Sequence, residues 1–409
     1  MKNTWRFDER ELGYIQEVLE TDFLSGTSGN MNQRLEKAFS AKVGAAFGVT
    51  MNSGTSTMHA CLAAAGVGPG DEVIVPALTV ISTASVVLHQ NAVPIFADID
   101  PRTFNIDPED VRRRITPRTR AIIPVSLYGL PADFDPILAL AEEHGLTVIE
   151  DAAQAHMAEY KGRKSGSICH MTSFSFENSK HITTGDGGIV TTNDEQLALA
   201  VRKFATLGYA GLSPSDGRVR KILKDELQSP EYKRHDGFGW NYRMPEVAAA
   251  VGLGQVEKIE RFVAMRRKIA AMYAEVIREE GADFLTPQFV PEGSVNVYFT
   301  FAASYDEKKA GKPWKEFRQA YKANGGDGIY AAWSPVHLEP VMRNLAFYGK
   351  GCPVRCPLYT GHVEYGPGLC PVAERVQPTL MQFVNNYRDE NEALPKVEAL
   401  RKTIRQCGR

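Results

Sequence analysis

The stretch from Met171 to Thr192, MTSFSFENSKHITTGDGGIVTT, decides how the chain folds. It begins with phenylalanine alternating with serine and ends with Ile189–Thr192, a pattern that predicts two strands joined by a loop. The loop is rich in glycine and carries one lysine, Lys180. A lysine on a loop between two core strands is placed to attack a carbonyl group. A solvated loop lysine is the ordinary alternative, so the partners found elsewhere in the chain decide between the two interpretations.

Strands and helices alternate on the N-terminal side of this stretch. The expected strands are Phe47–Met51, Val73–Pro76, Val93–Ala97, Ala121–Val125 and Thr147–Glu150. Helices of about a dozen residues are expected between them. This alternation predicts an α/β fold with a mostly parallel sheet and helices on both faces. Ligands of such sheets bind beyond the carboxyl ends of the strands.

The pattern changes on the C-terminal side. The segment Gly211–Gly239 is polar and rich in Ser, Pro and Gly, which is typical of an insertion or an active-site flap. Pro245 is expected to open one long helix that reaches about Glu280 and leads into a second domain of α+β type. Strands are expected in that domain at Val297–Ala302 and Gly328–Trp333. We therefore divide the chain into a large domain, 1–255, and a small C-terminal domain, 256–409.

Composition narrows the class of protein. The 409 residues include 43% hydrophobic and 23% charged residues with a net charge of −2, so nucleic acid is a poor candidate partner. The polar segment Met1–Arg10 is unlike a signal peptide, and the most apolar stretch, Val73–Leu88, is interrupted by proline and serine. A cytoplasmic location with reduced cysteines, and no membrane partner, is the expectation. The six cysteines lack the paired short spacing of zinc motifs, so no metal site is predicted.

Three further pieces can meet Lys180 at the carboxyl side of the sheet. Asp151 follows an apolar strand directly, and a carboxylate there can keep a heteroaromatic nitrogen protonated; a helix cap is its ordinary alternative. Ser53–Ser56 opens a helix with small residues, whose N–H groups suit a phosphate. Gly239–Pro245, GWNYRMP, is a polar and aromatic turn before the long helix, for which capping is the ordinary interpretation.

Taken in order, the motifs NSGTS, DEVIVPALT, PVSLYG, EDAAQAH, SFSFENSK, GDGG and NYRMPE resemble those of the DegT family of sugar aminotransferases. The resemblance covers nearly the whole chain. It implies the aspartate-aminotransferase fold, with a mostly parallel seven-stranded sheet in the large domain, and it implies pyridoxal 5′-phosphate as cofactor. It also implies a homodimer with a shared active site.

The resemblance assigns roles residue by residue. Lys180 would hold the cofactor covalently, Asp151 would bind its pyridine nitrogen, and Gln154 would lie near its phenolic oxygen. The residues implied for the cofactor phosphate are Gly54, Thr55, Ser175 and, from the neighbouring subunit, Asn241. Tyr128 and His337 are expected near the substrate, although Tyr128 has a packed core tyrosine as an equal alternative.

The chain departs from the family at several of these positions. Val80 stands where an aromatic residue usually stacks on the cofactor ring, and Ser126 and Glu177 stand where histidine is common. A side branch of the family has histidine in place of the lysine and dehydrates sugars. Here His181 is only the neighbour of Lys180, which favours amination.

The implied reaction moves an amino group from glutamate or glutamine to a keto sugar, with a nucleotide-linked sugar as the leading expectation. A free keto sugar or a cyclitol, a sugar dehydratase, and a cofactor-binding sensor without turnover are the alternatives. The segment Gly211–Gly239 offers cations that could meet a diphosphate, and these could equally be solvated charges. They are Arg218, Arg220, Lys221 and Lys224.

Overall fold

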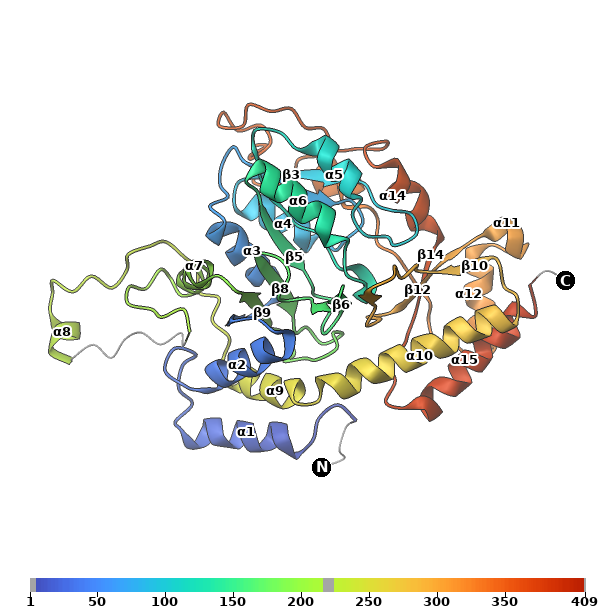
Figure 1. Cartoon of the computed structure of the whole chain (residues 1–409), viewed down its shortest axis with the longest axis horizontal. Helices are drawn as coiled ribbons and strands as arrows, with labels where there is room; N and C mark the ends of the chain where they lie inside the picture. Colours follow the sequence, from blue (N-terminus) through green and yellow to red (C-terminus); the bar gives the residue numbers. More distant parts are fainter. Residues whose placement is uncertain (1–4, 216–223, 408–409) are drawn as a thin grey trace.

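The computed structural model describes residues 5–215 and 224–407 and is built around one seven-stranded sheet (Figure 1). Across the sheet the strands are β1 (Phe47–Met51), β9 (Gly188–Thr192), β8 (Met171–Ser175), β5 (Thr147–Asp151), β4 (Thr119–Ile122), β2 (Glu72–Pro76) and β3 (Val93–Ala97). Strand β9 is antiparallel to both of its neighbours, whereas β8, β5, β4, β2 and β3 are parallel. The mostly parallel sheet of seven strands predicted from the family resemblance is therefore confirmed.

Helices cover both faces of this sheet, as the alternating pattern predicts (Figure 1). They include α2 (Met31–Val43), α3 (Gly54–Ala64), α4 (Ser82–His89), α5 (Pro108–Arg114), α6 (Phe134–His144) and α7 (Glu195–Ala205), whereas α1 (Glu9–Glu20) packs on α9 (Glu246–Val256). Side chains along β2 alternate between the two faces. Val73 and Val75 join one hydrophobic cluster and Ile74 joins another. A strand buried on both faces needs a continuous apolar run, which EVIVP provides.

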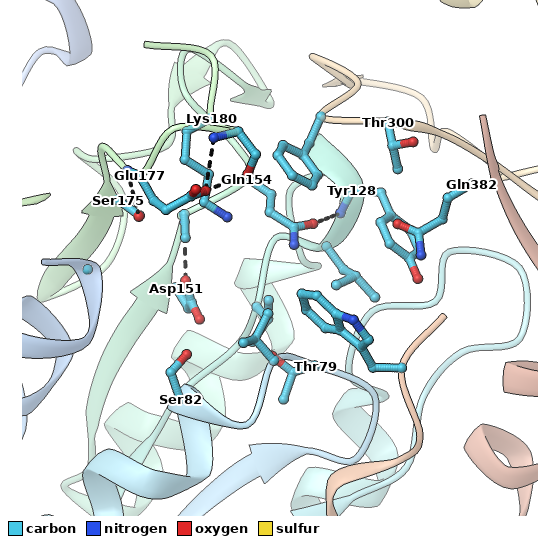
Figure 2. A pocket seen from close by; sticks show the side chains of 18 of the residues that line it. Thr79, Ser82, Tyr128, Asp151, Gln154, Ser175, Glu177, Lys180, Thr300 and Gln382 are labelled. Atoms are coloured by element: carbon cyan, nitrogen blue, oxygen red, sulfur yellow. Dashed lines mark hydrogen bonds between the residues drawn. The ribbon is translucent and has the colours of Figure 1, made fainter. Parts of the chain in front are cut away.

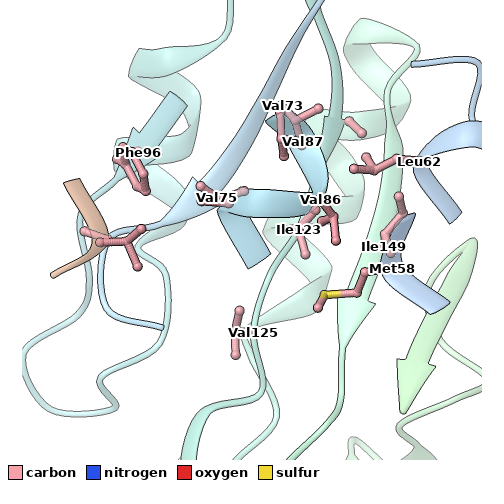
Figure 3. Packing of buried hydrophobic residues seen from close by; sticks show 14 of the residues in the cluster. Met58, Leu62, Val73, Val75, Val86, Val87, Phe96, Ile123, Val125 and Ile149 are labelled. Atoms are coloured by element: carbon pink, nitrogen blue, oxygen red, sulfur yellow. The ribbon is translucent and has the colours of Figure 1, made fainter. Parts of the chain in front are cut away.

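The largest hydrophobic cluster lies between β2, β4 and β5 and the helices α3 and α4 (Figure 3). Met58 and Leu62 from α3 and Val86 and Val87 from α4 pack there with Ile149 of β5, and each of the five is at most 2% exposed. This packing fixes the start of α3 and the end of β5 relative to each other, which matters because both ends carry predicted site residues.

One expected helix is two helices in the structure. The segment after Pro245 forms α9 (Glu246–Val256) and α10 (Ile259–Glu279), with a turn between them at Glu257 and Lys258. The Lys258 ammonium group is buried in this turn and pairs with Glu11 of α1 at 2.6 Å. Glutamate and lysine are both good helix formers, so the local sequence gives no sign of the break.

The C-terminal part forms a smaller domain around a four-stranded antiparallel sheet, at the right in Figure 1. Its strands are β10 (Leu285–Pro287), β12 (Phe301–Tyr305), β14 (Leu380–Phe383) and β13 (Tyr330–Ala331), and its helices include α11 (Glu307–Ala310), α12 (Trp314–Ala323) and α15 (Glu390–Ile404). The strand expected at Val297–Ala302 starts only at Phe301. The residues before it run beside the large domain instead, where Phe299 donates its N–H to the Tyr128 carbonyl at 2.9 Å.

The remaining short elements lie outside these two sheets. They are α8 (Lys224–Gln228), α13 (Pro340–Arg343), α14 (Pro371–Val376), and a three-stranded sheet of β6 (Glu159–Tyr160), β7 (Arg163–Lys164) and β11 (Ser294–Val295). The segment that carries α8 extends away from the body of the molecule, at the left in Figure 1.

The chain from about residue 336 to 376 returns to the large domain and packs over β2 and β3. Tyr359 donates to Glu72 at 2.8 Å, and the Val372 N–H donates to Asp98 at 2.8 Å. Within the described ranges, no helix is both long enough and apolar enough to cross a membrane. In the same ranges, no three His, Cys, Asp or Glu side chains are grouped so that they could hold a metal ion.

Candidate active site

A cavity of about 720 Å³ opens at the carboxyl ends of the parallel strands (Figure 2). Four of these strands lead to residues in its wall: Asp151 and Ser175 end β5 and β8, and Thr79 and Tyr128 lie on the loops that follow β2 and β4. Seven of the predicted site residues line this one cavity: Gly54, Thr55, Tyr128, Asp151, Gln154, Ser175 and Lys180. The expected position of a ligand at the carboxyl end of the sheet is thus matched by a cavity.

Lys180 lies on the loop between β8 and β9, and its ammonium nitrogen is 4.7 Å from the centre of the Phe299 ring. Burial lowers the pKa of Lys180, and so does the charge of Arg266, while the charges of Asp151 and Glu177 oppose this shift. A lysine with a lowered pKa is neutral in a larger fraction of molecules, which makes its nitrogen a better nucleophile.

Asp151 is the last residue of β5 and is 4% exposed. Its carboxylate accepts hydrogen bonds from the Ala153 N–H at 3.1 Å and from the Thr83 hydroxyl at 3.0 Å. Burial raises the pKa of Asp151, whereas these two donors and the Lys180 charge lower it. A carboxylate held in this way is suited to pair with a protonated ring nitrogen of a ligand.

The start of α3 lies directly against the end of β8. A Cβ atom added to Gly54 would lie 2.7 Å from the Cβ of Ser175, so only glycine fits between the two elements. Ser53 caps the helix by accepting the Ser56 N–H at 3.1 Å. The first turn of a helix leaves N–H groups without carbonyl partners, and together with the helix dipole they favour an anion such as phosphate.

Gln154 and Tyr128 are tied to each other. The Gln154 side-chain oxygen accepts the Tyr128 N–H at 2.7 Å (Figure 2). Tyr128 has a backbone φ of 60°, an uncommon value for a tyrosine, and is 4% exposed. Burial raises the pKa of its hydroxyl, so Tyr128 is a neutral hydrogen-bonding group in the wall of the cavity.

Two predicted site residues do not line this cavity. His337 is fully buried, donates its ring N–H to the Glu374 carboxylate at 2.9 Å, and packs against Phe96 from the segment that returns to the large domain. Asn241 is exposed and makes a bridge with Thr206. The exposure of Asn241 is compatible with a role in another subunit, whereas the contacts of His337 leave it away from the substrate space.

Of the three positions that depart from the family pattern, two line the cavity and one does not. Val80 and Glu177 line the cavity. Glu177 accepts from the Ser179 N–H at 2.9 Å and the Ser179 hydroxyl at 2.6 Å, which shapes the loop that leads to Lys180. Ser126 lies outside the cavity wall and donates to the buried Glu150 at 2.7 Å.

Several residues in or beside the site were not predicted from the sequence. Thr83 reaches Asp151 from α4, Arg266 reaches the cavity from α10, and Phe299, Tyr330 and Trp333 come from the C-terminal part. A threonine two residues into a helix carries a weak signal. The other four lie more than 80 residues from Lys180 in the chain, so only the fold brings them together.

Comparison with known proteins agrees with this geometry and identifies the class of enzyme. The structure superposes on the crystal structure of an aminotransferase from Psychrobacter cryohalolentis with a TM-score of 0.86, at 28% identity and with 98% of each chain covered. The fold and site are those of a fold-type I aminotransferase, a class that depends on pyridoxal phosphate.

Residues 6–367 match the model of the DegT/DnrJ/EryC1/StrS aminotransferase family, and the chain belongs to this family. It is 40% identical over 344 residues to GDP-perosamine synthase of Caulobacter vibrioides, which covers 83% of this chain and 86% of the relative. It is 34% identical over 386 residues to the L-glutamine:2-deoxy-scyllo-inosose aminotransferase of Streptoalloteichus tenebrarius, covering 92% and 86%.

The cavity fits the cofactor of this family. Gly54 and Thr55, in the first turn of α3, line the cavity together with Ser175 and suit a phosphate, and Asp151 offers a buried carboxylate for a ring nitrogen. Lys180 lines the same cavity. The three groups that pyridoxal phosphate requires are therefore present in one place.

Proposed function

We propose that this aminotransferase moves an amino group from glutamate or glutamine to a keto sugar. The observation that carries the proposal is that Lys180, Asp151 and the start of α3 line one cavity at the carboxyl end of the sheet. When bound there, pyridoxal phosphate supplies an electron sink for the carbon that exchanges its amino group.

The chain's own residues have distinct tasks in this proposal. Lys180 holds the cofactor covalently and, once released, moves a proton on and off the reacting carbon as general base and acid. Asp151 binds the ring nitrogen and keeps it protonated. Gln154 lies near the phenolic oxygen, held in place by its hydrogen bond from Tyr128. The buried wall around these groups limits the access of water.

The phosphate site combines two subunits in our proposal. Gly54, Thr55 and Ser175 supply one side, and Asn241 of a neighbouring subunit supplies the other. The exposure of Asn241, and its absence from the cavity wall of its own chain in the described residues, support a contribution in trans. The enzyme is then a homodimer, and we place it in the cytoplasm.

We also keep the proposed division into domains 1–255 and 256–409. It is supported by α10, whose first part packs with the large domain through Ile259 and Phe262. The later part of the same helix packs in the small domain through Ile269 and Tyr273.

A nucleotide-linked keto sugar is the leading acceptor, because one relative is named for a GDP-linked amino sugar. Tyr128 lines the cavity and is retained as a substrate contact, whereas His337 is not retained. The cations expected to meet a diphosphate are not informative here: Arg218, Arg220 and Lys221, and the side chain of Lys224, lie outside the described residues.

A free keto sugar or cyclitol is the second candidate, and one observation favours it. Among the described residues that line the cavity, the cations are Lys180 and Arg266. Arg266 is 5% exposed and donates to the carbonyls of Phe299 and Ser179, so it is committed to the backbone. A wall without a free cation suits an uncharged acceptor.

The deciding experiment compares kcat/KM for one keto sugar with and without its nucleotide, with glutamate and glutamine as donors. A nucleotide-linked acceptor predicts at least a tenfold loss when the nucleotide is removed, about 1.4 kcal/mol of transition-state binding. Equal efficiencies would select the free sugar or cyclitol. Release of one keto acid per amino sugar formed is expected with either acceptor, and its absence would contradict transamination.

A further inference from the structure

The N-terminal segment reaches the loop of the reactive lysine through Arg6. The Arg6 guanidinium donates to the Asn178 carbonyl at 2.6 Å and also to the Lys180 carbonyl. The two partners are 172 and 174 residues away in the sequence. Arg6 therefore binds the main chain of Lys180 itself from a distant part of the molecule.

A second guanidinium binds the same loop from another element. Arg266 of α10 donates to the Ser179 carbonyl at 3.1 Å and, more weakly, to the Lys180 carbonyl at 3.5 Å. It also donates to the carbonyl of Phe299, the residue whose ring faces the Lys180 ammonium group. Carbonyls of three consecutive residues, 178–180, thus accept from two guanidinium groups. A planar fork of several N–H donors suits such a task.

Arg6 is itself fixed by the junction between α9 and α10. Its carbonyl accepts from the Gln255 side chain at 2.7 Å and from the Lys258 ammonium group at 3.2 Å. The neighbouring Trp5 packs edge-on against the Phe262 ring, with 5.7 Å between the ring centres. The segment before α1 is therefore docked on the helices that also carry Arg266, and the two guanidinium groups share one support.

We propose that Arg6 is a positioning residue for Lys180: docked on the α9–α10 junction, it fixes the lysine loop and holds the amino group in the cavity. The inference rests on the proposed role of Lys180. Arg6 does not line the cavity in the described structure, so it acts through the main chain of the loop and does not touch substrate.

The charged groups and the burial around Lys180 determine how its pKa changes when the loop becomes less ordered. Asp151 and Glu177 raise the pKa of Lys180, and Arg266 lowers it, but burial is the largest cause of its lowered pKa. Arg6, His156 and His181 also lie near Lys180. Burial lowers the pKa of both histidines, and the Lys180 charge lowers it further, so both are neutral at pH 7. Burial and the Arg6 charge lower the pKa of Arg266 to about 9, which still leaves it charged at neutral pH. A looser loop exposes the amino group to water, so the pKa of Lys180 rises.

The test uses Arg6→Met, which keeps an apolar stem and removes the donors. Arg10→Met is the matched control, because Arg10 lies four residues further on, in the first turn of α1, is half exposed and makes a 3.9 Å contact with Glu257. The first readout is the pH dependence of Lys180 labelling by an amine-reactive acid anhydride in the full-length chain freed of cofactor, followed by peptide mass spectrometry. The second readout is kcat and KM of the loaded enzyme.

For Arg6→Met we expect the labelling midpoint to move up by about one pH unit. We also expect kcat to fall by roughly 10- to 100-fold, with KM for the acceptor changed less than about twofold, because misplacement of a reacting group affects the chemical step. Arg10→Met should match the wild type in both readouts. An unchanged midpoint and kcat in folded Arg6→Met would overturn the inference.

If Arg6→Met does not fold, Arg6→Lys decides. A single ammonium group can reach one carbonyl but cannot fork between two. A midpoint shifted upward with a kcat roughly 3- to 10-fold lower supports the inference, and wild-type values overturn it. The labelling midpoint is measured on the cofactor-free chain, so it reports on the Lys180 amine whichever lysine binds the cofactor. Failure of the proposed function, seen as a cofactor adduct on a different lysine, is thus separate from failure of the Arg6 inference.

Discussion

The hydroxyl of Thr83 donates a hydrogen bond to the carboxylate of Asp151 at 3.0 Å, and this contact ties the start of α4 to the end of β5. The donor stabilises the charged form of an acid whose pKa is raised by burial. The activity of Asp151 as a partner for a ring nitrogen therefore depends on a residue of a different element.

Replacing Thr83 by a residue that cannot donate should lower kcat, while the cofactor still binds. In Thr83→Val the pKa of Asp151 rises, so the acid limb of the kcat–pH profile moves to higher pH. We expect kcat to fall about tenfold or more, since a hydrogen bond to a charged group contributes roughly 1.5–3 kcal/mol. Ser85→Ala is the control, because Ser85 donates only to the Ile81 carbonyl of its own helix. A Thr83→Val profile that coincides with the wild type would show that Asp151 does not need this contact.

The close contact between α3 and β8 predicts an effect on cofactor affinity. In Gly54→Ala the new methyl group would lie 2.7 Å from the Ser175 Cβ and 3.2 Å from its Cα, so the helix must move away from the strand. We expect the Kd for pyridoxal phosphate, measured by fluorescence quenching, to rise at least about tenfold. Gly13→Ala in α1 is the control, because an added Cβ there meets no atom within 4 Å. Equal affinities for the two variants would contradict the phosphate site at Gly54.

A shared active site can be tested by complementation. Lys180→Ala and Asn241→Ala should each be inactive, but a mixed dimer keeps one intact site made of Lys180 from one subunit and Asn241 from the other. Random exchange of equal amounts makes half of the dimers mixed, so recovery of about a quarter of the wild-type activity is expected. No recovery in mixed dimers verified by mass spectrometry would place Asn241 outside the partner's site.

The turn that carries Asn241 should respond to mild acid. His59 accepts or donates a hydrogen bond with the Tyr242 hydroxyl at 2.9 Å, and burial lowers the pKa of His59 to about 4. A lowered histidine pKa means that the folded state resists protonation, so stability is full above the ordinary value near 6.5 and falls as the pH drops from there towards 4. The part of the free energy of unfolding that is lost through protonation of His59 is on the order of 3 kcal/mol.

His59→Phe keeps the aromatic contact with Phe204 and removes the titration. Its unfolding free energy, measured by urea denaturation, should fall less steeply between pH 6.5 and 4 than that of the wild type. Some slope remains because burial also lowers the pKa of His156 and His181. Identical slopes for variant and wild type would show that His59 is not the group that titrates there.

The sequence predicted those parts of the molecule that local pattern determines. Strand Val93–Ala97 has its expected bounds because a buried parallel strand is a continuous apolar run between turn residues. Phe47–Met51, which pairs with β9 in the antiparallel direction, also has its expected bounds. Strands β6, β7 and β11 are too short for any periodicity to be visible. The loop before Phe301 resembles a strand in sequence, yet its N–H groups at Val297 and Phe299 donate to the backbone of Gly129 and Tyr128 instead of a sheet neighbour.

The residues of the candidate site also divide into those that local sequence predicts and those that only the fold brings together. Residues within compact motifs, such as Asp151 and Lys180, could be placed in one cavity from sequence because each lies at or after the carboxyl end of a strand of the same sheet. His337 could not be placed, because its position depends on how the chain returns over β2 and β3. Arg6 and Arg266 were not predicted, since their partners are backbone carbonyls that leave no trace in the sequence.

The central claim is that Lys180 holds the cofactor, and reduction with borohydride tests it most directly. The protein loaded with pyridoxal phosphate should be yellow, lose that colour on reduction, and yield one modified peptide with the added mass on Lys180. Lys180→Ala should give no such adduct, while a variant of an exposed lysine, Lys161→Ala, should behave as the wild type. An adduct on another lysine of the wild type, or the same reducible adduct in Lys180→Ala, would contradict the account.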